Sequence, residues 1–162
     1  MRVAREAAAR LRAQLGLAGP TEAWAVCAAL GVPVDVFPFR GAVRGVYWNG
    51  RVAVRTGLSR RETQHVILHE IGHHLLHGPV GGAEFWVRRD PGMLRKYEGQ
   101  AEHFAYFFAL PGDELCALWR QETPAWEVGE RYGRTYWWLR QRVALAHAAG
   151  ELVPPPWRDL PA

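Results

Sequence analysis

Two histidines four residues apart, His69 and His73, flank Glu70 in the sequence His-Glu-Ile-Gly-His. On a helix such residues share one face, so both imidazoles can bind one zinc ion while the glutamate lies at the rim. Zinc lowers the pKa of a bound water toward about 7, and an adjacent carboxylate can take its proton as the oxygen attacks a carbonyl carbon. The pattern therefore indicates metal-assisted amide hydrolysis. Because five residues can also match this pattern by chance on an ordinary amphipathic helix, the neighbouring residues must decide.

The residues around this motif predict a long helix. Ser59 and Glu62 have the spacing of a capping box, in which each side chain bonds a free backbone N–H group at the start of a helix. An apolar stripe continues through the motif, and Gly78 marks the end. Gly72 weakens a helix by about 1 kcal/mol relative to alanine, so a backbone or a substrate is expected to approach closely there. An accidental small residue is the alternative.

A third protein ligand would hold zinc and leave one coordination position for water. His65 and His77 continue the four-residue spacing, but ligands two turns apart lie about 11–12 Å apart along a helix axis, too far for one ion. Pro79 stands where a longer three-histidine motif would need its third histidine. A carboxylate on a second helix remains, and Glu98 and Glu102 lie one turn apart there. We expect Glu98 to bind the metal and Glu102 to hydrogen-bond the outer nitrogen of a ligating histidine. Two solvated surface glutamates are the alternative.

The predicted second helix, residues 95–110, carries three further polar aromatic side chains. Tyr97, His103 and Tyr106 are candidates for the donor that stabilises the oxyanion during amide hydrolysis. Nothing in the sequence selects one of them, and such residues more commonly anchor a core. The connection before this helix, residues 78–94, is rich in glycine and proline and could be a lid or a simple spacer.

Together the two motifs resemble those of the ImmA/IrrE family of bacterial and phage zinc metallopeptidases. The run HVILHEIGHHLLH at 65–77 is followed by E-x-x-A-E-x-F-A at 98–105 and by Ala-Leu-Pro at 109–111. In that family the second motif begins approximately E-x-x-A-N-x-F-A, and its first glutamate, Glu98 here, is the third zinc ligand. Glu102 stands where the family usually has asparagine. The resemblance covers roughly residues 3–145, of which only the two motifs are specific.

The resemblance implies a zincin-like zinc endopeptidase. For the metal used in the cell, manganese is the alternative to zinc. Glu70 would then be the general base and later the general acid. The implied substrate is a helix-turn-helix (XRE-type) transcriptional repressor, whose cleavage induces stress or mobile-element genes.

Short β-strands are expected before the zinc helix. Residues 32–37, 43–48 and 52–55 have strand character, and Asn49-Gly50 is a two-residue hairpin turn. Helices are expected at 3–16 and 20–30. We therefore predict an α+β, zincin-like fold in which a small antiparallel three-stranded sheet packs on the helix of the HExxH motif. An edge strand near the metal could pair with an extended peptide substrate.

The C-terminal third has a second possible role. We expect residues 1–122 to form the metallopeptidase core and residues 123–162 a helical extension packed on it within one compact domain. Residues 125–149 have the order helix, glycine turn, helix, as in helix-turn-helix DNA-binding units. The second helix begins Tyr136-Trp137-Trp138, bulky groups unsuited to reading base edges, which favours packing over DNA binding. A noncatalytic DNA-binding regulator and a toxin-like or adaptor protein with a structural metal remain alternatives.

Composition agrees with one soluble domain. The chain has 162 residues, of which 49% are hydrophobic, enough for a single core. No apolar run approaches the roughly 20 residues needed to cross a bilayer, so no membrane partner is expected. Cys27 and Cys116 are far apart and fit no metal-binding spacing, which indicates reduced thiols and a cytoplasmic protein. The net charge of +4 is spread along the chain and locates no nucleic-acid patch.

Overall fold

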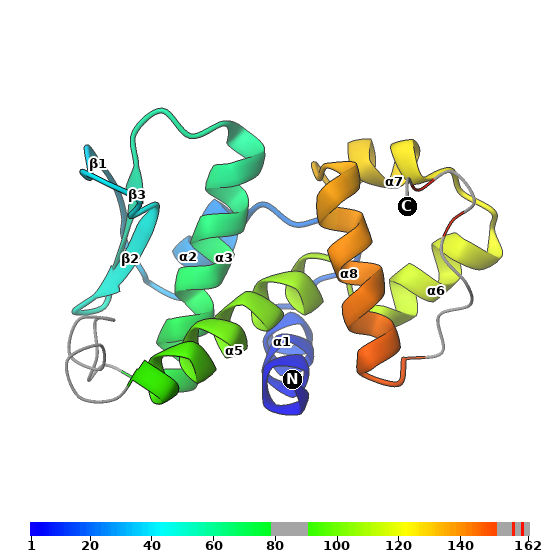
Figure 1. Ribbon diagram of the computed structural model, residues 1–162, viewed down its shortest axis with the longest axis horizontal. Helices are drawn as coiled ribbons and strands as arrows, with labels where there is room; N and C mark the ends of the chain where they lie inside the picture. Colours follow the sequence, from blue (N-terminus) through cyan, green and yellow to red (C-terminus); the bar gives the residue numbers. More distant parts are fainter. Residues whose placement is uncertain (79–90, 152–156, 158–159, 161–162) are drawn as a thin grey trace.

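The computed structural model describes residues 1–78, 91–151, 157 and 160 (Figure 1). Most of the expected connection over 78–94 therefore lies outside the described residues. Seven helices and three strands are described, in the order α1 (Arg2–Gln14), α2 (Ala23–Ala29), β1 (Val34–Phe37), β2 (Gly45–Trp48), β3 (Arg51–Arg55), α3 (Arg60–His77), α5 (Pro91–Ala109), α6 (Gly112–Arg120), α7 (Ala125–Arg131) and α8 (Tyr136–Ala148). The broad α+β class is confirmed. Helix α5 begins four residues before its predicted start.

The sheet is mixed, with the strand order β1-β3-β2. The prediction of an antiparallel sheet was wrong for β1, which runs parallel to β3 with Val34 opposite Val52. Strand β2 pairs antiparallel with β3 through the Asn49-Gly50 turn, where both residues have positive φ, 47° and 78°. Both central residues of a type I′ hairpin need that conformation. Strand β3 carries two buried valines, at positions 52 and 54, and lies at the centre of the sheet. The chain therefore passes from β1 at one edge of the sheet to β2 at the opposite edge before it forms β3.

Helix α3 begins with the predicted capping box. The Ser59 hydroxyl accepts a hydrogen bond from the Glu62 backbone N–H at 3.3 Å, and the Glu62 carboxylate accepts one from the Ser59 N–H at 2.9 Å. The helix continues through the HExxH motif, and Gly78 follows it with a positive φ of 72°. Buried Ile67 and Ile71 place one side of α3 in the core. In Figure 1, α3 lies beside the sheet and α5 crosses below it, and α3 contacts β2, β3 and α5.

Helices α3 and α5 approach closely at Gly72. A Cβ atom on Gly72 would lie 2.9 Å from Cα of Ala101 and 3.0 Å from its carbonyl oxygen. No such contact is tolerable between rigid backbones, so the glycine is needed for space. Of the explanations left open for Gly72, the close approach of a backbone is therefore the correct one. This contact sets how near α5 can come to the histidines of α3.

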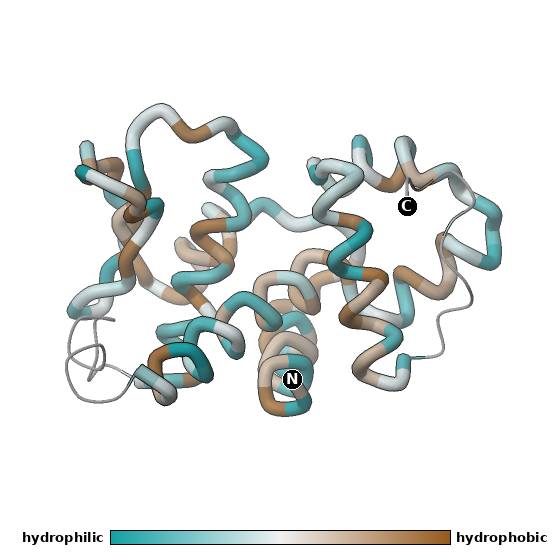
Figure 2. Tube along the Cα trace, viewed as in Figure 1, coloured by the Kyte–Doolittle hydropathy of each residue, from teal (hydrophilic) through white to brown (hydrophobic). Residues whose placement is uncertain are grey.

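The C-terminal helices share the core of the rest of the chain. Leu139, Val143 and Ala146 of α8 are buried in the same cluster as Phe104 and Phe108 of α5. Hydrophobic positions accordingly occur on both sides of the molecule in Figure 2. No helix among the described residues has the length and apolar character required to cross a membrane.

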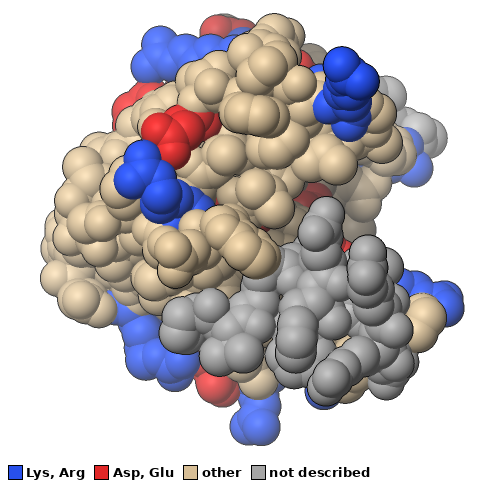
Figure 3. Space-filling model, turned by 90° about the vertical axis from the view of Figure 1, so that its left-hand side faces the viewer, with Lys and Arg blue, Asp and Glu red and all other residues tan. Residues whose placement is uncertain are grey.

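Basic and acidic side chains are interspersed on the face shown in Figure 3, as far as the described residues reach. Several arginines are paired with carboxylates across the surface. The pairs at 2.5–2.9 Å include Arg44 with Glu62, Arg51 with Asp35, Arg60 with Glu22 and Arg61 with Glu130. Much of the basic charge is thus neutralised locally.

Candidate metal centre

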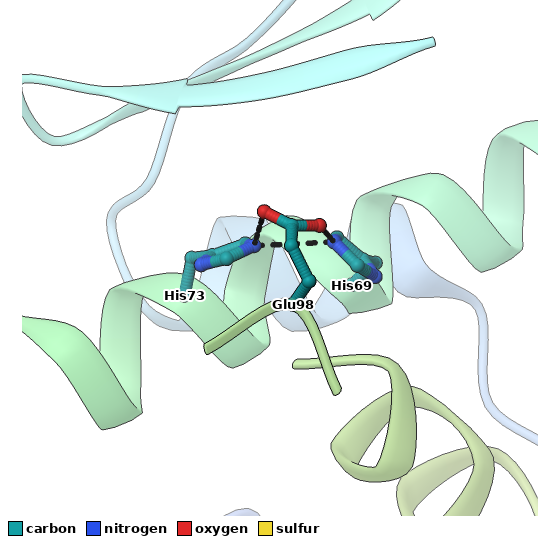
Figure 4. Close-up of side chains that lie close together, drawn as sticks. All are labelled: His69, His73 and Glu98. Atoms are coloured by element: carbon teal, nitrogen blue, oxygen red, sulfur yellow. Dashed lines mark hydrogen bonds and ion pairs between the residues drawn. The ribbon is translucent and has the colours of Figure 1, made fainter. Parts of the chain in front are cut away.

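Three side chains from two helices converge on one point (Figure 4). His69 and His73 lie one turn apart on α3, and Glu98 reaches them from α5. The Nε2 atoms of the two histidines are 3.1 Å apart. One Glu98 oxygen lies 3.2 Å from Nε2 of His69 and the other 3.3 Å from Nε2 of His73. The structure thus brings together the three predicted ligands, and within the residues it describes no other group of this kind is found.

These distances suit a tetrahedral zinc ion. Zinc binds imidazole nitrogen and carboxylate oxygen at about 2.0–2.2 Å, so neighbouring ligand atoms around it lie about 3.3–3.5 Å apart. The two nitrogens are 3.1 Å apart and need only a small expansion. A different oxygen of Glu98 faces each nitrogen, at 3.2 and 3.3 Å, and a set with one atom from each side chain lies within 4.8 Å. Three protein ligands leave a fourth position, as zinc enzymes require and closed structural sites do not.

The outer nitrogen of each histidine is held by another side chain. Oε2 of Glu102 lies 3.0 Å from Nδ1 of His69 and accepts its hydrogen. Nδ1 of His73 lies 3.0 Å from Nδ1 of His77, whose Nε2 is 3.0 Å from the Gln100 side-chain oxygen. With both outer nitrogens donating, both Nε2 atoms present lone pairs to each other and to a carboxylate. Such a concentration of acceptors is unfavourable unless a proton or a cation lies among them.

The pKa values of His69 and Glu98 are shifted by this crowding. Burial disfavours a charged His69, but the hydrogen bonds that it donates to Glu102 and Glu98 and the nearby charge of Glu70 outweigh this effect and raise the pKa of His69 to about 10. Hydrogen bonds from His69 and His73 lower the pKa of Glu98. The site therefore attracts positive charge, and a metal cation would compete with the proton for the same lone pairs.

Glu70 is enclosed between α3 and β2. Only 6% of the residue is exposed, and burial raises the pKa of its carboxyl group, against the charges of His69 and His73 and a hydrogen bond from the Tyr47 backbone N–H. Gly45 makes room for it, because a Cβ there would collide with Val66 and lie 3.0 Å from Oε1 of Glu70. The carboxylate thus has a fixed position beside the ligands.

A cleft of about 310 Å³ opens over these groups. Strand β2 forms one wall, with Gly45, Val46 and Tyr47, and the ligands and Glu70 form the other. Within the described sheet β2 is an edge strand, since it pairs with β3 on one side only. Of the strands considered for pairing with a peptide, β2 is therefore the one beside the candidate metal ligands.

The three candidate oxyanion donors do not line this cleft. The Tyr97 ring packs on His77 with 4.2 Å between centroids. Tyr106 packs on Trp138 with 4.9 Å between ring centroids. His103 has a buried Nδ1 atom without a hydrogen-bond partner, and burial lowers its pKa. The structure thus singles out none of them for this role.

Sequence reasoning missed the supporting side chains. His65 and His77 were considered only as ligands, whereas His65 hydrogen-bonds Glu102 at 3.0 Å and His77 contacts His73. Their four-residue spacing from the ligands was the available signal. Tyr47 was also missed; it lines the cleft and its hydroxyl lies 2.7 Å from Nδ1 of His74. Strand position alone gave no indication of that contact.

Comparison with known proteins gives limited information. No protein-family model matches the chain, and no curated protein matches it. Among solved structures, a Mycobacterium tuberculosis transcriptional regulator matches 98% of this chain with a TM-score of 0.62 and 17% sequence identity. The match covers 49% of that protein, so this chain spans about half its length. At such low identity the similarity concerns the fold alone.

Proposed function

We propose that this protein is a zinc-dependent endopeptidase with a zincin-like fold. The observation that carries the proposal is the convergence of His69, His73 and Glu98 beside an enclosed glutamate and an open cleft. A three-ligand set with a free coordination position is typical of catalytic zinc, whereas structural zinc normally has four protein ligands. This argument also weighs against an adaptor or toxin-like protein that uses the metal only for structure.

The residues of the site would have separate roles in the reaction. When bound, zinc would supply Lewis acidity and lower the pKa of a coordinated water toward about 7. Glu70 would accept a proton from the attacking water and later deliver it to the departing amine nitrogen. The free edge of β2 would hold the substrate extended by backbone hydrogen bonds, which tolerates many side chains. Manganese could replace zinc in the cell, since the nitrogen and carboxylate ligands suit both ions.

The proposed substrate is a helix-turn-helix repressor of the XRE type in the cytoplasm, as the resemblance to the ImmA/IrrE family implies. Its cleavage would switch on stress or mobile-element genes. The substrate rests on analogy between families and not on the geometry of the cleft.

Two variants test the peptidase. Purified protein would be incubated with the repressor encoded beside its gene and with zinc or manganese, and the fragments identified by mass spectrometry. We expect Glu70→Gln to bind zinc as the unaltered protein does but to stop cleavage, because the amide cannot accept the proton. Glu98→Ala should lose metal affinity and, with it, cleavage. Cleavage by Glu70→Gln at the normal rate would disprove the assigned base.

A noncatalytic DNA-binding regulator is the second candidate, and the name of the matched transcriptional regulator favours it. Against it, Leu139 and Val143 of α8 are buried in the core, and several arginines are already paired with carboxylates. A regulator of this kind should bind the promoter beside its gene with an affinity that falls steeply as salt rises. Absence of binding at low salt would eliminate this candidate.

A further inference from the structure

A chain of hydrogen bonds runs from α8 to the metal-binding face of α3. The indole N–H of Trp138 donates to Nδ1 of His65 at 3.1 Å. Nε2 of His65 lies 3.0 Å from Oε1 and 3.1 Å from Oε2 of Glu102. Oε2 of Glu102 lies 3.0 Å from Nδ1 of His69. Four side chains from three helices are thus joined end to end, and the last of them is a proposed ligand.

The direction of this chain follows from the chemistry of its first member. An indole ring has a hydrogen to donate and no lone pair to accept with, so Nδ1 of His65 must be the acceptor. The hydrogen of a neutral His65 ring then lies on Nε2, facing Glu102. A carboxylate can only accept, so Glu102 also receives the hydrogen on Nδ1 of His69. A neutral His69 ring, the form that can bind a metal, consequently has its lone pair on Nε2, toward Glu98 and His73.

The packing around this chain limits movement of its members. Trp138 is 7% exposed, and its ring packs on Tyr106 with 4.9 Å between centroids. Tyr106 also contacts the His65 ring at 5.3 Å, so one tyrosine abuts both partners of the first hydrogen bond. The adjacent Trp137 is 63% exposed. The two tryptophans of α8 therefore have opposite environments.

We propose that Trp138 is a positioning residue for the metal ligand His69 and acts through His65 and Glu102. Its N–H group selects the His65 tautomer, which orients the Glu102 carboxylate and so holds the His69 ring with Nε2 turned to the metal position. The inference rests on the proposed metal site. It means that the C-terminal helices contribute to metal affinity although none of the three ligands belongs to them.

A double-mutant cycle on the full chain tests this role. The variants are Trp138→Phe, which keeps an aromatic ring but removes the donor, Glu102→Ala, which interrupts the chain, and the two combined. Trp137→Phe is the matched control, one residue away on the same helix. Zinc affinity would be measured by competition with a chromophoric chelator, and thermal unfolding of the metal-free variants would report on the fold.

We expect Glu102→Ala to weaken zinc binding about 10- to 100-fold, as removal of a partner of a ligating histidine generally does. Trp138 is two hydrogen bonds further from the ligand than Glu102, so Trp138→Phe should weaken zinc binding less, about 3- to 10-fold. In the Glu102→Ala background the Trp138→Phe change should have no further effect, because residues that act in series are not additive. Trp137→Phe should bind zinc like the unaltered protein.

Three results would overturn the proposal: unchanged zinc affinity in Trp138→Phe, the same loss in Trp137→Phe, or an equal additional loss in the Glu102→Ala background. If Trp138→Phe does not fold, His65→Phe serves instead, since it keeps a ring beside Tyr106 and breaks the same chain. The same three criteria then apply to it. Failure of the unaltered protein to bind zinc would instead refute the proposed function itself, which keeps the two failures distinguishable.

Discussion

The contact between Gly72 and Ala101 provides a quantitative test of how the proposed metal site is assembled. Replacing Gly72 with alanine adds a carbon 2.9 Å from Cα of Ala101, whereas nonbonded carbon atoms rest about 3.5–4.0 Å apart. Since the nearest atoms belong to the backbone of α5, no side-chain rotation relieves the collision. The two helices must separate locally by about 0.6–1.1 Å, the difference between these distances.

This displacement is large compared with the tolerance of a metal site. Metal–ligand distances hold to within about 0.2 Å, so moving Glu98 away from His69 and His73 should weaken zinc binding at least about tenfold, or about 1.4 kcal/mol. Stability should change less. Overpacking costs about 1–3 kcal/mol, but alanine favours a helix over glycine by about 1 kcal/mol. The net loss of unfolding free energy is therefore expected to be about 0–2 kcal/mol.

Chelator competition would give the zinc affinity of this variant, and urea unfolding of the metal-free protein its stability. Gly99→Ala is the matched control. Gly99 lies on α5 next to Glu98, and a Cβ there meets no atom within 4 Å. This control should gain up to about 1 kcal/mol of stability and keep its zinc affinity. If Gly72→Ala also binds zinc as tightly as the unaltered protein, the argument that this helix contact positions Glu98 is refuted.

Further predictions concern stability. Ser59→Ala should lower the unfolding free energy by about 1 kcal/mol in urea titrations, since it removes the cap of α3; no change would contradict the role of the cap. Arg12→Ala should cost about 3 kcal/mol, because it removes the cation paired with Glu114 at 2.7 Å in a site where the arginine side chain is 6% exposed, and leaves that carboxylate only its bonds from Gly19 and Tyr132. Zinc at 100 times its Kd should add about 2.7 kcal/mol to the unfolding free energy. Glu98→Ala should show little of that gain, and a full gain in this variant would exclude Glu98 as a ligand.

Features controlled by neighbouring residues could be predicted well. The capping box at Ser59, the continuous helix through the HExxH motif and the Asn49-Gly50 turn all depend on contacts within a few residues. For these features the geometry of one element leaves little choice, and the structure agrees with each of them. The choice of Glu98 needed the additional assumption that a second helix lies alongside the first.

Features that depend on distant parts of the chain could not be derived in this way. The parallel pairing of β1 with β3 was missed because strand character does not reveal which neighbour a strand selects. The three candidate oxyanion donors were listed by residue type, and only the tertiary structure shows that none of them lines the cleft and that Tyr97 packs on His77 and Tyr106 on Trp138.

The sequence alone was thus sufficient to place His69, His73 and Glu70 close together on one helix, because a helix repeats every 3.6 residues. How near Glu98 comes to them was decided only in three dimensions, where a glycine lets two backbones approach. The same holds for Trp138, which lies 73 positions from His65 and bonds it only because α8 packs against the core. Burying apolar surface determines which helices meet, and that depends on the whole chain at once.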